Sequence, residues 1–467
     1  MWRLCAAPFQ RGERESERVS GRHIVVVGAS IAGLGAAWQL KSRGFEVSVL
    51  EREQRAGGRV ETIRDDGFSL DVGNPLLSTG DHRLLAWIEE LGLRDEMLPL
   101  HPVLIAQVHR GRVHEVDTRN PFGAFRTPGI GKREALRLVR LPRLIARYGS
   151  DIDPATPECG EGLDDRSLSD FGRLYFGNTV LTRWMAPLVT GTTFGDEKET
   201  SRVLFLRRFR QERGQHLRLP RAGLEEVAAA AAEQLGTRFG VEVTRIDWRH
   251  GGPIRLTLVE RGPGEGRHLT RECDTVVVAT SAAEARRIAQ PVLEPAERDV
   301  LGRMHTTPSV ALFLRLRRPF HSHCRLIRVP HDEDSPIESV LLEPGTSGGR
   351  APEGRGLATI RATGAFGRES RELSEDVVEK ALLDAFEVFQ PGARNAIEST
   401  RLRRVESAAS QFGVGHFRAI ARLERVLADV RRRGRKVYFA GDYLMGPTWE
   451  DALASGHRAA ERVADTG

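Results

Sequence analysis

Near its beginning the chain carries a short run of β-branched apolar residues, His-Ile-Val-Val-Val at His23–Val27. A run without alternating polar positions predicts a strand that is buried on both faces of a parallel sheet. A glycine-rich segment follows, and a helical pattern then extends through Leu40 and ends at Arg43-Gly44. A second strand is predicted at Val47–Leu50. Together these elements predict a βαβ unit, in which a helix joins two parallel strands.

The turn between the first strand and the helix has the spacing of a dinucleotide-binding fingerprint. Gly28 permits a tight turn, and Gly33 lets the helix pack closely on the sheet. The free N–H groups at the start of the helix, at Ile31 and Ala32, favour a pyrophosphate. Ser30 stands where the fingerprint has its second glycine. Serine is the least disruptive replacement there, and its hydroxyl is a candidate donor to a phosphate oxygen.

An acidic residue completes the unit. Glu51 follows the second strand directly, about 20 residues past the glycines. Its carboxylate is expected to accept a hydrogen bond from a ribose 2′-hydroxyl and to repel a 2′-phosphate, which argues against NADP. The strand, helix and acid in this order predict a dinucleotide site.

No apolar run reaches the ~18 residues that a membrane-spanning helix needs. The amphipathic segment 132–148 carries arginines at helical spacing opposite Ala135, Leu138, Val139 and Ile145. We interpret it as one surface helix, kinked or ended by Pro142, that packs its apolar stripe on the core. The alternative is peripheral contact with anionic lipid.

The composition narrows the class of protein. A chain of 467 residues with 40% hydrophobic and 29% charged residues is typical of a soluble enzyme of two or three domains. The net charge of +6 comes from 70 basic and 64 acidic residues, and nearly all of the basic residues are arginine. This excess is interpreted as codon bias, so we expect no nucleic-acid partner. The four cysteines lie far apart and favour a cytoplasmic location, with attachment to the inner face of the membrane as an alternative.

The segment after Glu51 resembles the extended fingerprint of flavoproteins of the amine oxidase, protoporphyrinogen oxidase and phytoene desaturase superfamily. There an acid is followed by a spacer and Gly-Gly-Arg, which is Gly57-Gly58-Arg59 here. The C-terminal block from Gly441 to Gly456 is similar to the motif that closes on the flavin in this superfamily. The resemblance implies FAD as cofactor. It implies these cofactor-binding residues: Gly28, Ser30, Ile31, Ala32, Gly33, Glu51, Arg52, Gly58, Arg59, Val60, Gly73, Asn74, Val243, Ala279, Thr280, Gly441, Asp442, Pro447, Thr448, Trp449 and Leu453.

The same resemblance implies an α/β fold in which a Rossmann-like FAD-binding domain is interleaved with an α+β substrate-binding domain. We assign residues 22–74, 215–290 and 401–467 to the FAD-binding domain, and 75–214 and 291–400 to the substrate domain. Residues 1–21 are expected to be a disordered extension. In the C-terminal block, a helix from about Glu450 is expected to point its N-terminus at the flavin.

The middle of the chain is similar to protoporphyrinogen and coproporphyrinogen oxidases, in segments such as Ala186–Gly191 and Gln411–His416. Two departures bear on the substrate. Ile105 stands where these oxidases usually have an arginine that pairs with a propionate, which favours an isoprenoid chain instead. No lysine lies between Lys198 and Lys380, so the lysine of the amine oxidases is missing. Ile105 and Tyr443 are predicted to line the substrate pocket, and no catalytic residue is assigned.

The resemblance therefore implies an FAD-dependent oxidoreductase that dehydrogenates a hydrophobic substrate by hydride transfer to flavin N5, with oxygen or another electron acceptor. A tetrapyrrole, oxidised as by protoporphyrinogen or coproporphyrinogen oxidase, is the favoured substrate. The alternatives are, in order, a carotenoid or other isoprenoid desaturase, an amine oxidase and a flavin-binding protein without turnover. The histidines at His321, His323 and His331 with Cys324 are not interpreted as a metal site, because no acid or second cysteine pair completes them.

Overall fold

The computed structural model describes residues 22–99, 105–116, 121–212, 217–261, 266–320, 322, 324–346 and 349–466. The predicted extension 1–21 and the histidines His321 and His323 lie outside the described residues.

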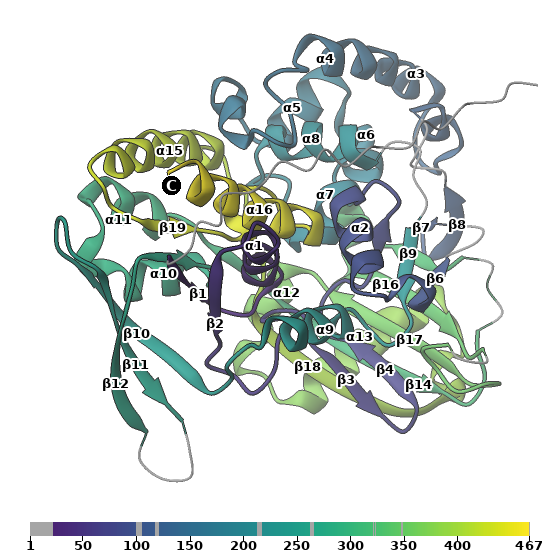
Figure 1. Ribbon diagram of the computed structural model, residues 1–467. Helices are drawn as coiled ribbons and strands as arrows, with labels where there is room; N and C mark the ends of the chain where they lie inside the picture. Colours follow the sequence, from purple (N-terminus) through teal and green to yellow (C-terminus); the bar gives the residue numbers. More distant parts are fainter. Residues whose placement is uncertain are drawn as a thin grey trace, which may run out of the picture.

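A four-stranded parallel sheet contains both strands of the predicted βαβ unit (Figure 1). Along β1, Ile24 and Val26 pack into one hydrophobic cluster and Val25 and Val27 into another. Both faces are therefore buried, as the unbroken apolar run predicts. The strand order is β19 (Val437–Phe439), β13 (Thr275–Val278), β1 (His23–Val27) and β2 (Glu46–Leu50).

Helices cover both faces of this sheet. One cluster joins it to α1 (Ile31–Ser42), α2 (His82–Glu90), α9 (Glu225–Leu235) and α16 (Trp449–Asp465). The other face packs on α10 (Ala282–Ile288), α11 (Pro295–Gly302) and α15 (His416–Arg432). The predicted helix after Gly28 and the predicted start of the C-terminal helix are confirmed, the latter within one residue.

A seven-stranded sheet forms the second large layer (Figure 1). Its strands pair antiparallel except for β15 with β7, which run parallel. Helix α13 (Glu375–Phe389) packs on one face of this sheet through Leu382 and Phe386. The order is β18 (Ile397–Ser410), β14 (Thr306–Leu316), β17 (Gly356–Ala362), β16 (Ile337–Pro344), β15 (Leu326–Arg328), β7 (Ile105–His109) and β8 (Arg112–Val116).

Smaller elements complete the described chain. The sheets are β3 (Thr62–Asp65) with β4 (Phe68–Asp71); β5 (Leu77–Ser78), β9 (Leu217–Pro220) and β6 (Met97–Pro99); and β10 (Val241–Trp248), β11 (Ile254–Glu260) and β12 (Arg267–Cys273). The helices are α5 (Leu168–Tyr175), α6 (Asn178–Val180), α7 (Pro187–Thr193), α8 (Arg202–Glu212), α12 (Gly364–Glu369) and α14 (Ala393–Ala396).

The parallel sheet takes its strands from all three segments that we assigned to the FAD-binding domain. One assigned boundary crosses an element, because β18 begins at Ile397 and pairs with β14 of the other domain along its length. The rest of the domain division stays a prediction.

The amphipathic segment 132–148 is not one continuous helix. It forms α3 (Lys132–Ala135), a 3-10 turn over Leu136–Arg140 and α4 (Leu141–Arg147), with Pro142 in the first turn of α4. Ala135 and Leu138 are buried in the core, which confirms the interpretation as a packed surface segment. Val139, predicted in the buried stripe, is instead 49% exposed, because the 3-10 turn rotates it away from the core.

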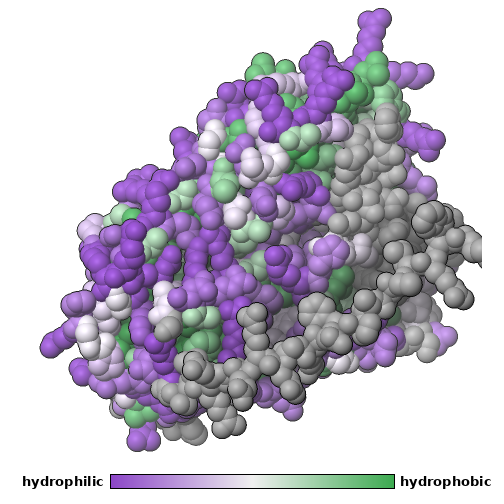
Figure 2. Space-filling view, turned by 45° about the horizontal axis from the view of Figure 1, so that its top comes forward, coloured by the Kyte–Doolittle hydropathy of each residue, from purple (hydrophilic) through white to green (hydrophobic). Residues whose placement is uncertain are grey.

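The surface is mixed. On the face shown in Figure 2, hydrophobic side chains lie in small patches among hydrophilic ones. Among the described residues no helix is both long enough and apolar enough to cross a membrane.

Candidate active site

A cavity of about 700 Å³ lies beside the parallel sheet and reaches the face of the seven-stranded sheet opposite α13. Most residues predicted to bind the cofactor line it, and they come from segments more than 400 residues apart. They are Gly28, Ser30, Ile31, Ala32, Glu51, Arg52, Gly58, Arg59, Gly73, Asn74, Val243, Ala279, Thr280, Gly441, Asp442, Pro447, Thr448 and Trp449.

The β1–α1 turn is built as tightly as its glycines predict. Gly28 has a φ of +103°, a backbone conformation that residues with a side chain rarely adopt. A Cβ at this position would also stand 2.9 Å from the carbonyl oxygen of Ala279. A Cβ on Gly33 would stand 2.0 Å from the carbonyl oxygen of Gly28. Both positions therefore exclude any larger residue. The first turn of α1 is thereby held at the cavity wall, where its free N–H groups favour an anion.

The side chain of Ser30 forms its hydrogen bonds within the protein. Its Oγ donates a hydrogen bond to the carbonyl oxygen of Ala279 (2.9 Å) and accepts one from the backbone N–H of Gly33 (3.3 Å). The hydroxyl thus caps α1 and ties it to β13. The proton that we predicted for a phosphate oxygen is engaged in this contact.

Glu51 is 7% exposed at the end of β2. Its two carboxylate oxygens accept hydrogen bonds from the backbone N–H groups of Ala29 (2.7 Å) and Glu53 (2.9 Å). The side chain therefore holds the β1–α1 turn against the next loop. Each oxygen keeps a second lone pair, so the geometry still allows a hydroxyl donor such as a ribose.

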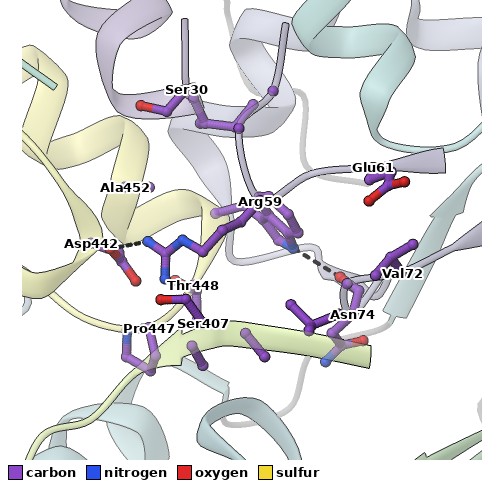
Figure 3. A pocket seen from close by; sticks show the side chains of 18 of the residues that line it. Ser30, Arg59, Glu61, Val72, Asn74, Ser407, Asp442, Pro447, Thr448 and Ala452 are labelled. Carbon is purple, nitrogen blue, oxygen red and sulfur yellow. Dashed lines mark hydrogen bonds and ion pairs between the residues drawn. The ribbon is translucent and has the colours of Figure 1, made fainter. Parts of the chain in front are cut away.

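The Gly57–Arg59 loop and the C-terminal block meet across the cavity. Arg59 forms an ion pair with Asp442, and Figure 3 shows both side chains with Pro447 and Thr448 around them. Gly57 and Gly58 have φ values of +103° and +60°, so the loop uses both glycines for its turn. The predicted positive and negative groups are therefore brought together, and each is available to a ligand on its cavity side.

The Gly73–Asn74 segment is held in place by buried charges. Trp449 Nε1 donates a hydrogen bond to the carbonyl oxygen of Asn74 (2.8 Å). Arg361 donates to the carbonyl oxygens of Asp71 and Gly73. Behind it, Arg350 pairs with Asp71 at 2.8 Å and with Glu343 at 2.5 Å. Burial lowers the pKa of Arg361 to about 10, so it stays cationic at neutral pH.

Helix α16 begins at this site with a complete capping box. Thr448 Oγ1 accepts a hydrogen bond from the N–H of Asp451 (3.1 Å), and Asp451 Oδ2 accepts one from the N–H of Thr448 (3.2 Å). Because Thr448 and Trp449 line the cavity, the positive end of the helix dipole lies at its wall.

Four predicted residues do not line the cavity. Gly33, Val60 and Leu453 pack behind the wall; the last two are 2% and 0% exposed. Tyr443, predicted as a wall of the substrate pocket, is not among the residues that line this cavity. Its side chain is 2% exposed and belongs to the hydrophobic core, where its ring packs against Gly441.

Ile105, by contrast, lines the cavity beside Leu326 and Leu341; that this part of the cavity holds the substrate stays a prediction. Three charged residues near this apolar wall were not predicted from the sequence, namely Asp81, Arg208 and Arg328. Burial raises the pKa of Asp81 to about 7, although the Ser78 N–H and Arg208 oppose the shift. The only sequence signal was indirect, since Arg328 and Arg361 interrupt otherwise apolar strands.

His331 lies in a separate acidic cluster. Its Nδ1 is 2.7 Å from a carboxylate oxygen of Glu197, and its Nε2 is 3.3 Å from one of Glu338. Burial acts to lower the pKa of His331, but the hydrogen bonds to the two glutamates outweigh burial and raise the pKa to about 10. Ligand atoms of Asp196, Glu197 and His331 lie within 4.8 Å of one another. Protonated His331 accounts for this cluster as an ion-pair network.

Nearly the whole sequence matches a known family. The family model of flavin containing amine oxidoreductases matches residues 31–464. The chain therefore belongs to this family, which confirms the predicted superfamily, the FAD cofactor and the class of FAD-dependent oxidoreductase. The glycine cradle, the helix N-terminus and the acid at the end of β2 fit that cofactor.

Individual relatives differ in how much of the chain they match. Coproporphyrinogen III oxidase of Propionibacterium freudenreichii subsp. freudenreichii is 24% identical, over 95% of this chain and 91% of that protein. Protoporphyrinogen oxidase 2 of Arabidopsis thaliana is 28% identical over 40% of this chain. The aligned segment spans only 36% of the length of that relative. A solved structure of putrescine oxidase has a TM-score of 0.75 and 18% identity, and covers 95% of this chain and 99% of its own. The last likeness confirms the predicted α/β flavoprotein fold.

Proposed function

We propose that this flavoenzyme dehydrogenates a hydrophobic substrate, with a porphyrinogen as the favoured one. FAD, when bound, supplies the hydride acceptor at its N5, and oxygen or another acceptor takes the electrons onward. The chain's own residues bind, orient and shield the reactants. Gly28, Glu51 and Arg59 are assigned to the cofactor, and Ile105 to the substrate.

The observation that carries the choice of substrate is the composition of the cavity wall. Leu326, Leu341 and Ile105 form an apolar surface, and the side chains of Arg208 and Arg328 lie on the same cavity. A porphyrinogen combines a large apolar ring system with carboxylates, and this wall offers a surface for each part. The likeness to coproporphyrinogen III oxidase over 95% of the chain supports the same choice.

An isoprenoid desaturase remains the second candidate, because Ile105 is apolar where a propionate partner was expected. Amines rank lower. Among the described residues that line the cavity there is no lysine, the group on which the amine-oxidase interpretation depends.

The test is anaerobic flavin reduction. Coproporphyrinogen and protoporphyrinogen are each mixed with purified holoprotein, with phytoene and a set of primary amines in parallel. Bleaching of the flavin by a porphyrinogen alone is the expected result. Bleaching by phytoene or an amine alone would replace the proposed substrate, and bleaching by none would refute the proposed dehydrogenation of these classes.

A further inference from the structure

The apolar wall of the cavity ends in a cation on the same sheet face. Leu326 of β15 pairs with Ile105 of β7 on one side and with Leu341 of β16 on the other, and all three line the cavity. Arg328 lies two residues further along β15, so it shares this face, and it pairs with Ser339, which also lines the cavity. An apolar row that crosses β7, β15 and β16 therefore lies directly beside a guanidinium group on the same face of the sheet.

This guanidinium is incompletely satisfied. Among the described residues, Arg328 Nη1 is buried and has no hydrogen-bond partner. Burial lowers the pKa of Arg328 to about 10, which leaves it charged at neutral pH. The acid that opposes this shift, Glu338, is already bonded to Thr190 (2.6 Å) and to His331 (3.3 Å). A buried donor without a partner is costly, so a ligand that accepts from it would gain free energy on binding.

A second cation faces the same part of the cavity. Arg208 of α8 lines the cavity and is 6% exposed. Burial, together with the nearby charge of Arg328, lowers its pKa, while Asp451 and Asp81 act in the opposite direction. Asp81 titrates near neutral pH because burial raises its pKa to about 7, so it offsets only part of the positive charge. The two arginines thus make this end of the cavity favourable for an anion.

We propose that Arg328 binds a carboxylate of the substrate, with Arg208 as the second cation, while Ile105, Leu326 and Leu341 hold its apolar body. This inference rests on the proposed function in treating the cavity as the substrate site. It identifies the substrate as an amphipathic carboxylic acid and Arg328 as the residue that selects it. It also supplies a propionate partner in place of the arginine that Ile105 replaces.

The test compares acids with their esters on oxidised holoprotein, where no turnover is needed. The probes are protoporphyrin IX with its dimethyl ester, and dodecanoate with methyl dodecanoate. Binding is measured by the shift of the flavin absorption. Wild type is expected to bind an acid about ten- to a hundredfold more tightly than its ester, as for a hydrogen bond to a charged group. Arg328→Gln is expected to remove this preference.

Arg325→Gln is the matched control, because Arg325 precedes the same strand but does not line the cavity; it should keep the preference. FAD content and thermal midpoint report whether each variant is folded. A preference confined to the porphyrin pair identifies a tetrapyrrole acid, and one confined to dodecanoate an aliphatic acid. Equal binding of acid and ester by wild type, an unchanged preference in Arg328→Gln, or no binding of any probe would overturn the proposal. Flavin reduction by a porphyrinogen is a separate measurement, so the two failures are distinguishable.

Discussion

The two walls of the cavity are built in different ways. On the cofactor wall, Gly28, Ser30 and Glu51 lie within one βαβ unit, and their polar groups are bonded to the protein itself. On the wall that we propose for the substrate, Ile105 and Leu326 come from strands 221 residues apart that pair in parallel, and Arg328 Nη1 has no hydrogen-bond partner among the described residues. The first wall is a rigid cradle for a constant ligand. The second is an apolar surface with one charge left for a ligand to satisfy.

The largest effect is expected from a substitution that disrupts the β1–α1 turn. Gly33→Val places side-chain atoms where even a Cβ would stand 2.0 Å from the Gly28 carbonyl oxygen. The helix cannot then pack on β1, and we expect folded protein with bound FAD to be lost. The flavin-to-protein ratio after purification measures this. Gly162→Ala is the control, since a Cβ there meets nothing within 4 Å; equal flavin content in the two variants would contradict the close packing.

The next effect concerns Asp81, an acidic residue that lines the cavity. The pKa of Asp81 is raised from 3.8 to about 7, so the folded protein keeps this proton when the unfolded chain has lost it. The stabilising contribution is present below pH 4 and is lost as the pH rises to about 7, by up to about 4 kcal/mol. Free energies of unfolding of wild type and Asp81→Asn should therefore diverge between pH 4 and 7, with wild type losing more. A constant difference between them would contradict a buried, neutral Asp81.

A smaller effect is expected at Glu51, and it is compared with the effect at an exposed glutamate of the same strand. Glu51→Ala leaves the N–H groups of Ala29 and Glu53 without their partner, at an expected cost of about 2–4 kcal/mol in stability. FAD should also bind more weakly. Glu46→Ala, at the exposed start of β2, is the control and should change little. Urea unfolding measures the change in stability, and FAD titration of the apoprotein measures the change in affinity. Equal effects of the two substitutions would contradict the role of Glu51 in holding the β1–α1 turn.

The smallest effect tests the cap. Ser30→Ala removes the hydroxyl that caps α1 and bonds Ala279, which is expected to cost about 1 kcal/mol. Ser374 precedes α13 without a side-chain cap bond, so Ser374→Ala should be nearly neutral. The difference between the two thermal midpoints measures the contribution of the cap. A stabilised Ser30→Ala variant would contradict this role.

The contrast between the walls also explains what could be predicted from the sequence. The wall proposed for the cofactor depends on local patterns, namely the apolar run of β1, the glycines after it and the acid after β2. These patterns predict a dinucleotide site, and the resemblance of the later motifs to a flavoprotein superfamily identified the dinucleotide as FAD. The substrate wall depends on which strands pair. Nothing in the sequence states that Leu326 lies between Ile105 and Leu341, so Arg328 was not found. Tyr443 was misplaced because its neighbours in sequence line the cavity, while its own side chain turns into the core.

The central claim is that the two walls join FAD to an amphipathic substrate that it oxidises. The most direct measurement is an anaerobic mixture of holoprotein with coproporphyrinogen, in which the flavin absorption and the Soret band are recorded together. Conversion of a porphyrinogen to its porphyrin releases six electrons and each flavin accepts two, so the holoprotein is kept in more than threefold molar excess. The account predicts that flavin absorbance falls and that the porphyrin's Soret absorbance then rises, with three flavins reduced for each porphyrin formed. A flavin that stays oxidised, or one that bleaches while no porphyrin forms even at this excess, would contradict it.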